Sequence, residues 1–376
     1  MRYKMADVVT EIKEKEDHPS ESKYERFVGL EHYVSGEIVI RNFGSTELLE
    51  SSMKVFRSGD ILVARRNVYL KRASVAMFDG LTSGDSIVLR AKNERVGRLL
   101  PFVLNTDAFW DFADQYSDGT MSKRLSPKTL MEYEFDLPDE SEQDELADIL
   151  WAAVDAKHSY QELLKQTDEL VKSRFIELFG DVQKEEKYKG IPLKKICRTT
   201  SGGTPSTKFP EFYRGNIPWI TTVSLGPNHI DGTNAKGYIT KQAIESSATK
   251  LIPAGNILFG TRVGVGKSSI NDVDICTNQD IVAIVGIDES KFKKLFIKHV
   301  LDSYQKHYDS LKKGATILGI TSDDLKETLI PLAPMDVQKE FENFVEQVDK
   351  SKFEIKKSIE NISELIKSLM QQDFTN

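Results

Sequence analysis

Two long stretches of the chain carry hydrophobic side chains at alternating spacings of three and four residues. This heptad spacing is typical of helices that pack along one another. The stretches span residues 141–179 and 335–372, and each predicts a helix of about 40 residues, roughly 60 Å long at 1.5 Å per residue. The first seam contains Leu146, Ile149, Ala153, Ala156, Tyr160, Leu163, Thr167 and Leu170, and the second contains Phe341, Phe344, Val348, Ser351, Ile355, Ser358, Ile362, Leu365 and Leu369.

The two seams are in phase, since adding 195 to positions 146, 149 and 153 gives 341, 344 and 348. A single amphipathic helix usually packs on the core of its own domain, and this is the ordinary alternative for either stretch. Neither neighbouring segment can cover so long a stripe, so we expect the helices to pack together as an antiparallel pair. Asp139, Ser141 and Asp336 are candidate N-caps, and Gly180 is a candidate stop.

The same offset relates segments outside the helices. Thr82-Ser83-Gly84-Asp85 aligns with Thr277-Asn278-Gln279-Asp280 at 280 − 85 = 195, and Gly59-Asp60-Ile61-Leu62 aligns with Gly255-Asn256-Ile257-Leu258 at 255 − 59 = 196. A period of this length excludes a solenoid, whose repeats are about 20–50 residues long. We therefore interpret the chain as two copies of one module, a globular domain followed by a long helix.

Each globular part is predicted to be a mixed α/β domain, because short apolar runs alternate with Gly, Asp and Ser turns. The fold class expected is α+β, with two such domains, a pair of long antiparallel helices and a pseudo-two-fold internal repeat. The expected strands are 37–40, 61–63, 74–77 and 86–89, then 219–223, 256–260, 267–270 and 281–285; the expected helices are 96–112 and 290–311. The expected domains are 1–138, the first spacer helix and linker 139–183, the second domain 184–334 and the second spacer helix 335–376.

Composition places the chain among globular proteins, with 39% hydrophobic and 29% charged residues in 376. No apolar run approaches the roughly 18 residues of a membrane span, and the N-terminus lacks the apolar core of a signal peptide. Cys197 and Cys276 are expected to be free thiols, with a disulfide as the minority alternative. These features favour a cytoplasmic protein with no membrane segment.

A net charge of −7 argues mildly against nucleic-acid binding, but DNA responds to the local field rather than to the sum. Acidic residues crowd the start of the first long helix, where they complement its dipole. Basic residues gather in the globular parts, at Arg57, Arg65, Arg66, Lys71 and Arg72 and at Lys291, Lys293, Lys294 and Lys298.

Three stretches are candidates for contacting DNA. The run Arg65–Arg72 contains Arg and Asn, which pair bidentately with guanine and adenine, although it could be a solvated hairpin. The loop Thr200–Thr207 offers hydroxyls and free backbone N–H groups to phosphate oxygens, although it could be a plain surface loop. Arg262 and Lys267 flank a glycine-rich turn. The full candidate set is Arg65, Arg66, Asn67, Tyr69, Lys71, Arg72, Thr200, Ser201, Gly202, Gly203, Thr204, Thr221, Thr222, Arg262 and Lys267.

Catalytic motifs are not visible. The run Gly260–Ser268 places five residues instead of four before its Gly-Lys pair, and no helix is expected after it, so it is not a phosphate-binding loop. The histidines lack metal-ligand spacing, and neither a glycine-rich cofactor signature nor an Asn/Asp-Pro-Pro-aromatic methylation motif occurs. Glu185-Glu186-Lys187 could be the tail of a nuclease motif, but its place in a linker favours a solvated charge run. We expect no catalytic residue and no metal site in this chain.

The order of these features, found twice, resembles the DNA-specificity subunit of type I restriction–modification enzymes. Each half shows a Gly-Asp/Asn-Ile-Leu…Arg run, then Thr-Ser-Gly-Asp or Thr-Asn-Gln-Asp, a Gly-Thr or Gly-Ala-Thr turn, prolines, a Gln and the long helix. The resemblance covers essentially the whole chain. Its best carriers are Gly255–Arg262, Thr277–Ile281, Gly314–Leu332 and Pro334–Gln338.

The resemblance implies a non-catalytic subunit in which each domain reads one half of a split, asymmetric site in double-stranded DNA. The helical pair would set the unread gap and dock two methyltransferase (modification) subunits, which restriction subunits join. S-adenosylmethionine, ATP and Mg²⁺ would belong to those partners, and so would base flipping and adenine methylation. The implied partner-binding helix residues are Leu146, Ile149, Leu163, Leu170, Phe341, Phe344, Ile355, Ile362 and Leu369.

The first half departs from this pattern. Met5-Ala6-Asp7-Val8-Val9 stands where Pro192–Ile196 stands in the second half, and the Ser-Gly-Gly-Thr-Pro loop has no counterpart. We therefore expect the two domains to contact DNA differently, and the acidic total suggests weak DNA binding by the isolated chain. A protein-binding coiled-coil scaffold and a nuclease or methyltransferase with an unrecognised motif remain the alternatives.

Overall fold

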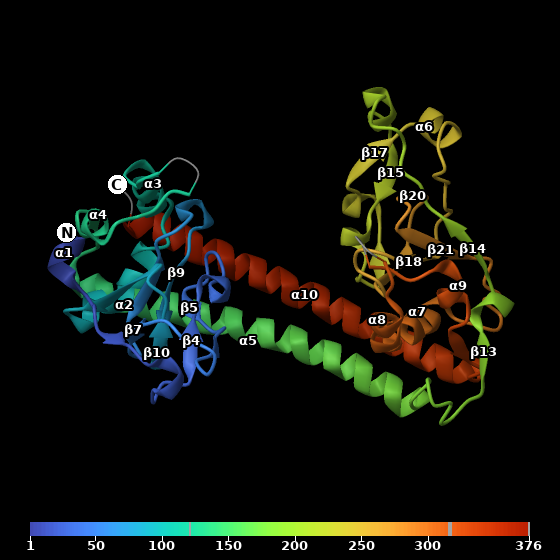
Figure 1. Ribbon diagram of the computed structural model, residues 1–376, viewed down its shortest axis with the longest axis horizontal. Coiled ribbons are helices and arrows are strands. Elements are labelled where there is room, and N and C mark those ends of the chain that lie inside the picture. The colour runs from blue at the N-terminus through green and yellow to red at the C-terminus, as the bar shows by residue number, and fades with distance from the viewer. Residues whose placement is uncertain (120–121, 315–317, 375–376) are drawn as a thin grey trace. The chain divides into compact units, whose positions relative to one another are not determined.

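The computed structural model describes residues 1–119, 122–314 and 318–374 (Figure 1). Contacts divide the chain into two compact units, each built from a globular domain and parts of both long helices. Unit 1 contains residues 1–163 and 354–376, and unit 2 contains residues 164–353. The Gly-Thr and Gly-Ala-Thr turns expected at 119–120 and 314–316 fall largely outside the described residues.

The main sheet of unit 1 has five strands in the order β2-β11-β8-β9-β5, antiparallel except for the pair β5–β9. These strands are β2 (Val9–Glu11), β11 (Ser86–Ala91), β8 (Ile61–Ala64), β9 (Ala73–Ala76) and β5 (Val39–Ile40). Each of the four expected strands of the first domain is found here, with ends shifted by one or two residues.

Further elements of unit 1 surround this sheet. A second five-stranded sheet has the order β3-β7-β10-β4-β6, and β1 pairs with β12. Its strands are β3 (Lys15–Glu16), β7 (Met53–Phe56), β10 (Gly80–Thr82), β4 (Arg26–Val28) and β6 (Gly44–Ser45); the pair is β1 (Arg2–Lys4) with β12 (Glu134–Asp136). The helices are α1 (Met5–Val8), α2 (Glu94–Val103), α3 (Asp107–Gln115) and α4 (Pro127–Met131).

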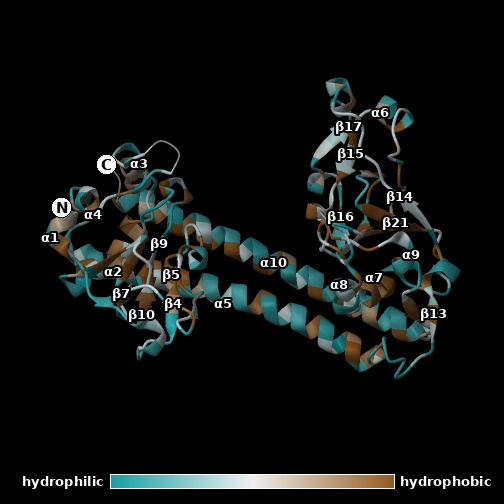
Figure 2. Ribbon diagram, in the orientation of Figure 1, coloured by the Kyte–Doolittle hydropathy of each residue, from teal (hydrophilic) through white to brown (hydrophobic). Residues whose placement is uncertain are grey.

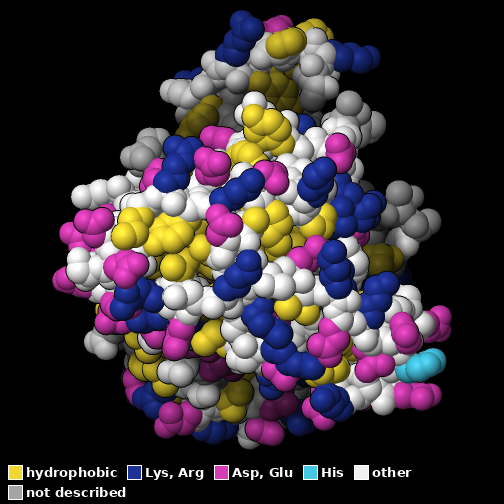
Figure 3. Space-filling model, turned by 90° about the vertical axis from the view of Figure 1, so that its left-hand side faces the viewer, with side chains coloured by type: hydrophobic (Ala, Val, Ile, Leu, Met, Phe, Trp, Pro, Cys, Tyr) yellow, Lys and Arg dark blue, Asp and Glu magenta, His cyan; other side chains and the backbone are white. Residues whose placement is uncertain are grey.

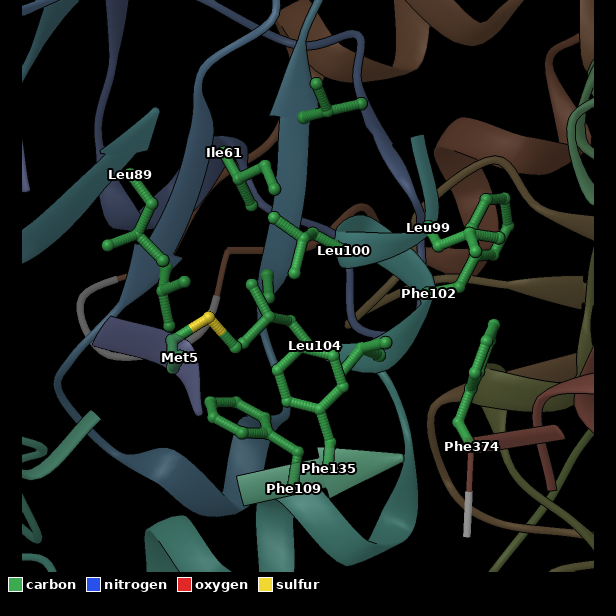
Figure 4. Close-up of a cluster of buried hydrophobic side chains, with 14 of the residues drawn as sticks. Met5, Ile61, Leu89, Leu99, Leu100, Phe102, Leu104, Phe109, Phe135 and Phe374 are labelled. Carbon is green, nitrogen blue, oxygen red and sulfur yellow. The ribbon is translucent and has the colours of Figure 1, made fainter. Parts of the chain in front are cut away.

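The core of unit 1 joins the sheet, α2 and α3 to the long helices. Met5, Ile61 and Leu89 pack with the helical side chains in one buried cluster (Figure 4). Phe374, from the end of the last helix, is buried in the same cluster as Phe102 of α2. The globular domain therefore cannot form its full core without the end of the chain.

Unit 2 repeats this architecture. Its main sheet has the order β14-β21-β18-β19-β16, a three-stranded sheet has the order β17-β15-β20, and β13 pairs with β22. The strands are β14 (Arg198–Ser201), β21 (Ile281–Val285), β18 (Ile257–Gly260), β19 (Ser268–Asn271), β16 (His229–Ile230), β17 (Gly237–Ile239), β15 (Ile217–Ile220), β20 (Cys276–Thr277), β13 (Gly190–Pro192) and β22 (Leu329–Pro331). The helices are α6 (Lys241–Glu245), α7 (Lys294–Ser303), α8 (Gln305–Leu311) and α9 (Ser322–Lys326).

The strand registers reproduce the duplication seen in the sequence. Ile61 pairs with Leu89 in unit 1, and Ile257 pairs with Ile284 in unit 2, at offsets of 257 − 61 = 196 and 284 − 89 = 195. The turn before each strand also repeats, because Gly59 and Gly255 both take the left-handed backbone that favours glycine, with φ of +90° and +75°. The two domains are therefore copies at the level of hydrogen-bond register.

Both long helices form as expected. Helix α5 (Glu140–Phe179) and helix α10 (Met335–Phe374) are 40 residues each, and Gly180 ends α5 with a φ of +70°. In unit 1 the early part of α5 shares a core with the late part of α10, and in unit 2 the late part of α5 packs on the early part of α10. The helices are therefore antiparallel, as the repeat predicted, and they lie side by side in both units (Figure 1).

The expected inter-helix seam is wrong at three positions of α5. Ile149, Leu163 and Leu170 are 44%, 41% and 52% exposed. The buried apolar positions of α5 are Leu146, Ala147, Leu150 and Val154 in unit 1 and Val171, Phe175 and Phe179 in unit 2. Each end of α5 packs on a domain as well as on α10, so its buried stripe is not the narrow heptad seam. The central turns of both helices are mostly hydrophilic (Figure 2).

Two smaller predictions concern the cysteines and membrane-spanning helices. Cys197 and Cys276 are free thiols, and burial raises the pKa of each to about 11, which makes them poor nucleophiles. Across the described residues, no helix has both the length and the apolar character that crossing a membrane requires.

Candidate nucleic-acid interface

An arginine and an aspartate form the same pair in both domains. Arg66 Nη1 lies 3.4 Å from Asp85 Oδ2, and Arg262 Nη1 lies 3.7 Å from Asp280 Oδ1. Each arginine follows the strand β8 or β18, and each aspartate precedes the neighbouring strand β11 or β21. The pairing brings together two of the repeated sequence motifs. The arginine side chains remain 51% and 55% exposed, so the carboxylate orients a guanidinium that solvent can still reach.

The surroundings of the pair differ between the domains. In unit 1, Arg124 also bonds Asp85 and forms a bridge with the backbone of Arg66. In unit 2 the matching position is Gly319 (124 + 195), where an added Cβ would lie only 2.8 Å from Arg262 Cγ. Unit 1 therefore carries a second guanidinium where unit 2 has none. Arg124 was not among the candidates predicted from the sequence, because the repeat offset aligns it with a glycine and no repeated motif marks it.

Arg65 and Arg72 stabilise the turn to which they belong. Arg65 Nε donates to the Leu125 carbonyl at 3.2 Å, and burial, aided by nearby Arg124, lowers the pKa of Arg65. Arg72 donates to the Leu30 and Arg66 carbonyls at 3.0 and 2.9 Å. Both guanidinium groups are thus engaged with backbone that holds Arg66 in position.

The turn between β8 and β9 leaves one aromatic side chain in solvent. Asn67 and Lys71 both adopt left-handed backbone, with φ of 54° and 46°, and between them Tyr69 is 65% exposed. Asn67 Oδ1 accepts a hydrogen bond from Ser122 at 2.9 Å. Lys71 Nζ bonds Asp107 at 2.6 Å and lowers the pKa of that carboxyl. Of the six first-domain candidates, Arg66 and Tyr69 are the most available.

The glycines of the second-domain loop have a packing role that was not expected. We expected free backbone N–H groups there, but Gly202 and Gly203 donate to the Ile281 and Thr277 carbonyls at 3.0 and 2.8 Å. A Cβ on Gly202 would lie 2.1 Å from the Asn278 oxygen. The expectation of free N–H donors is wrong at these two residues, because the loop crosses directly over the turn before β21.

The hydroxyl candidates of the second domain are unequally accessible. Ser201 and Thr204 are exposed and Thr200 is half-buried, with Thr204 Oγ1 bonded to the Gln279 side chain. Thr221 and Thr222 are buried. Only the first three can reach a partner without movement of the chain.

The glycine-rich turn after β18 is confirmed as a hairpin. Gly260 N bonds the Lys267 carbonyl at 2.9 Å, and strand β19 begins at Ser268 in place of the helix that a phosphate-binding loop needs. Lys267 and Val263 are exposed on this turn. The turn thus presents Arg262 and Lys267 from one short segment.

On the face drawn in Figure 3, Lys and Arg side chains are interspersed with Asp and Glu, with hydrophobic groups between them. Many of these charges are paired, so this face does not present one continuous basic surface. For contacts with DNA, individual exposed arginines on this face therefore matter more than its overall electrostatic potential.

Comparison with known proteins matches part of this sequence to one family. Residues 185–364 match the family model described as the type I restriction modification DNA specificity domain. The chain is 29% identical over 162 residues to the MjaIX specificity subunit of Methanocaldococcus jannaschii, and 30% identical over 175 residues to the EcoR124I/EcoR124II specificity subunit of Escherichia coli. These matches cover 43% and 44% of this chain but only 37% and 42% of the relatives.

Solved structures match over the whole length. The type I restriction–modification S subunit from M. genitalium superimposes with a TM-score of 0.57 at 13% identity, covering 100% of this chain and 96% of that one. A chain from a study of complex assembly and conformational transition of the type I R-M system gives 0.51 at 16% identity, covering 99% and 96%. Residues 185–364 thus contain a type I restriction modification DNA specificity domain, and the fold of the whole chain is that of the solved type I S subunit. The predicted fold is confirmed with it.

The charge run Glu185-Glu186-Lys187 is part of a turn after α5. Glu185 accepts a hydrogen bond from Gly190 N at 2.6 Å, and Glu186 accepts one from Asp181 N at 2.9 Å. Both carboxylates thus hold the segment after α5. Within the described ranges, no group of three or more His, Cys, Asp and Glu side chains is arranged to hold a metal ion.

Proposed function

We propose that this chain is the non-catalytic, sequence-reading subunit of a type I restriction–modification complex in the cytoplasm. Each globular domain reads one half of a bipartite, asymmetric site in double-stranded DNA. The observation that carries this proposal is the repeated Arg–Asp pair, Arg66 with Asp85 and Arg262 with Asp280. A half-exposed guanidinium that is oriented by a carboxylate suits bidentate recognition of a guanine edge.

The contacts around each pair suggest which neighbours take part. Tyr69, Lys267 and the hydroxyls of Thr200, Ser201 and Thr204 would add phosphate or sugar contacts. Asn67, Lys71, Arg65 and Arg72 would act through the shape of their turn. Gly202 and Gly203 would act through close packing, and Thr221 and Thr222 would need a local rearrangement to touch DNA.

The long helices would set the gap between the half-sites and dock two modification subunits, with restriction subunits joining them. Exposed Ile149, Leu163 and Leu170 on α5 support docking, because they are apolar groups on a largely hydrophilic helix. The side chains of Phe344, Ile362 and Leu369 are half-buried and would add their exposed parts to this docking surface. Leu146, Phe341 and Ile355 are buried and would stabilise the helices beneath it. S-adenosylmethionine, ATP and Mg²⁺ would bind the partners.

Base-level methylation mapping tests this function. Cells that express the chain with its modification subunits are expected to methylate one bipartite motif, at one base in each half. Cells that lack only this chain are the control and should show no such motif. Absence of the motif in the complete cells would refute the proposal, and methylation by the purified chain alone would establish the enzyme alternative. Assembly without any sequence preference would instead identify a scaffold.

A further inference from the structure

The domain of unit 1 packs on α5 along a buried stripe from Leu146 to Val154, and Arg95 and Arg98 form ion pairs with the start of the helix. Two further contacts with the helix lie apart along its axis. At the first, Trp151 Nε1 donates to the Arg98 carbonyl at 2.9 Å, and its ring meets Phe102 of α2 at 5.4 Å. At the second, Lys157 Nζ bonds Glu37 Oε1 at 2.8 Å, with both side chains largely buried. Six residues separate Trp151 from Lys157, which is about 9 Å along the helix axis.

Unit 2 has the same arrangement on α10. At the first point, Lys293 Nζ lies 2.9 Å from Glu342 Oε2, and Lys293 N donates to Gln338 Oε1 at 2.8 Å. At the second, Asn228 Nδ2 donates to Asp349 Oδ2 at 2.7 Å. Seven residues separate Glu342 from Asp349, which is about 10 Å along the axis. Each domain therefore makes two separated contacts of this kind with the helix that follows it, in addition to its apolar packing on that helix.

The second contacts come from equivalent places in the two sheets. Glu37 and Asn228 lie just before β5 and β16, the parallel edge strands of the main sheets. The backbone there repeats as well, because Val75 N bonds the Ile38 carbonyl and Ile270 N bonds the Asn228 carbonyl, both at 2.8 Å. The side chains that make the contact have changed, but its location has not.

We propose that the Glu37–Lys157 and Asn228–Asp349 contacts are positioning contacts that fix the tilt of each domain on its helix, and that they thereby restrict the gap between half-sites that the complex accepts. This rests on the function proposed above. A single contact point acts as a pivot, whereas two points about 9–10 Å apart define an angle.

DNA geometry makes the tilt matter. One added base pair moves the second half-site by about 3.4 Å and rotates it by about 34–36° around the duplex. Domains that are held at a fixed tilt cannot follow this displacement, so a wrong gap loses contacts in one half-site. Domains that can pivot would recover part of those contacts.

A cavity makes the Glu37–Lys157 contact hard to replace by packing. A space of about 260 Å³ lies beside it, with Gly36, Glu37, Lys157, Ile366 and Met370 among the residues in its wall. Without the ion pair, the segment before β5 has room to move into this space. The packing of α5 on the domain core around Trp151 would remain and would serve as the pivot.

The test uses the assembled complex with its modification subunits. Initial methylation rates are measured on duplexes that carry the mapped half-sites with the native gap or with one or two base pairs added or removed. For Lys157→Met and Asn228→Ala we expect the rate at the native gap to stay within about twofold, and the native-to-wrong-gap ratio to fall about tenfold, since a charge-assisted hydrogen bond contributes about this factor.

Two further variants separate positioning from general stability. The charge-swapped double variant Glu37→Lys with Lys157→Glu restores the contact and should recover gap selectivity. Arg2→Met removes the exposed Arg2–Glu134 pair inside the domain of unit 1 and should leave the ratio unchanged.

An unchanged ratio in both Lys157→Met and Asn228→Ala would overturn the inference. Equal loss of rate at every gap would overturn it too, because it would mark a role in folding or assembly. A wild-type complex that shows no gap preference at all would refute the proposed function, which keeps the two failures distinct.

Discussion

Gln143 and Gln338 hold the same position near the start of the two long helices and make the same hydrogen bond. Each side chain is fully buried and donates to the backbone carbonyl five residues earlier, Gln143 to Pro138 at 2.9 Å and Gln338 to Ala333 at 2.8 Å. The same side chain–backbone hydrogen bond therefore holds the start of each helix in both copies. Residues inserted after Gln143 or Gln338 would therefore lengthen the helix toward its C-terminal end, because the start of the helix stays fixed on its domain.

Lengthening both helices is expected to lengthen the gap between half-sites. One heptad inserted into the hydrophilic centre of α5 and one into that of α10 keep the antiparallel pairing and add roughly 10 Å. This corresponds to about three base pairs of duplex. Methylation mapping of the variant complex measures the new gap. An unchanged gap would remove the role of the helices in spacing, and insertion into α5 alone is the mismatched control.

Loss of either repeated arginine is expected to relax one half of the recognised site. Arg66→Ala or Arg262→Ala should cost about 1–3 kcal/mol of binding free energy and broaden the base preference at one position. Competition binding with single-base variants of the site measures this. Lys267→Ala is the matched comparison and should weaken binding to all sequences alike. Intact DNA binding and specificity in both arginine variants, with assembly preserved, would support the scaffold alternative.

The stability of unit 2 is expected to fall in mild acid because of His299. Burial, with Lys298 and Lys352 nearby, holds the pKa of His299 well below its usual 6.5, and its ring packs against Phe175 and Phe341. The unfolded chain binds a proton below about pH 6.5 and the folded chain does not, so the free energy of unfolding falls as the pH is lowered, by at most about 1.4 kcal/mol per pH unit.

Urea unfolding at pH 7.5 and 5.5 measures this dependence, and His299→Phe should flatten it between those values. Asp302 Oδ2 lies 4.0 Å from His299 Nδ1, and its negative charge opposes the effect. An equal pH dependence in wild type and His299→Phe would contradict the assignment to this residue.

Much of the fold was predictable because local pattern and global fold agree. The runs at 61–63 and 281–285 are short, apolar and bounded by turns, and both form strands. The long helices follow from periodicity together with the stop at Gly180, whereas the candidate caps Ser141 and Asp336 lie inside the helices. The Arg66–Asp85 contact was not predicted, although both residues belong to motifs that the repeat had singled out.

Other parts of the site depend on neighbours that are distant in the chain. Gly202 looked like a flexible, DNA-facing residue, yet it packs against Asn278. Leu163 fitted the heptad seam, yet it is exposed. The spacing of apolar residues along one helix cannot show whether that helix packs on its domain or on the other helix.

The sequence by itself determined the duplication, the antiparallel helices and the three central strands of each main sheet, β11-β8-β9 and β21-β18-β19, because repeat offsets and hydrophobic periods act locally and identically in both copies. Only the tertiary structure decided which arginines reach solvent and which hold backbone, which apolar residues of α5 stay exposed, and where each domain is fastened to its helix. Those outcomes depend on burial, and burial is set by packing between segments that the sequence keeps far apart.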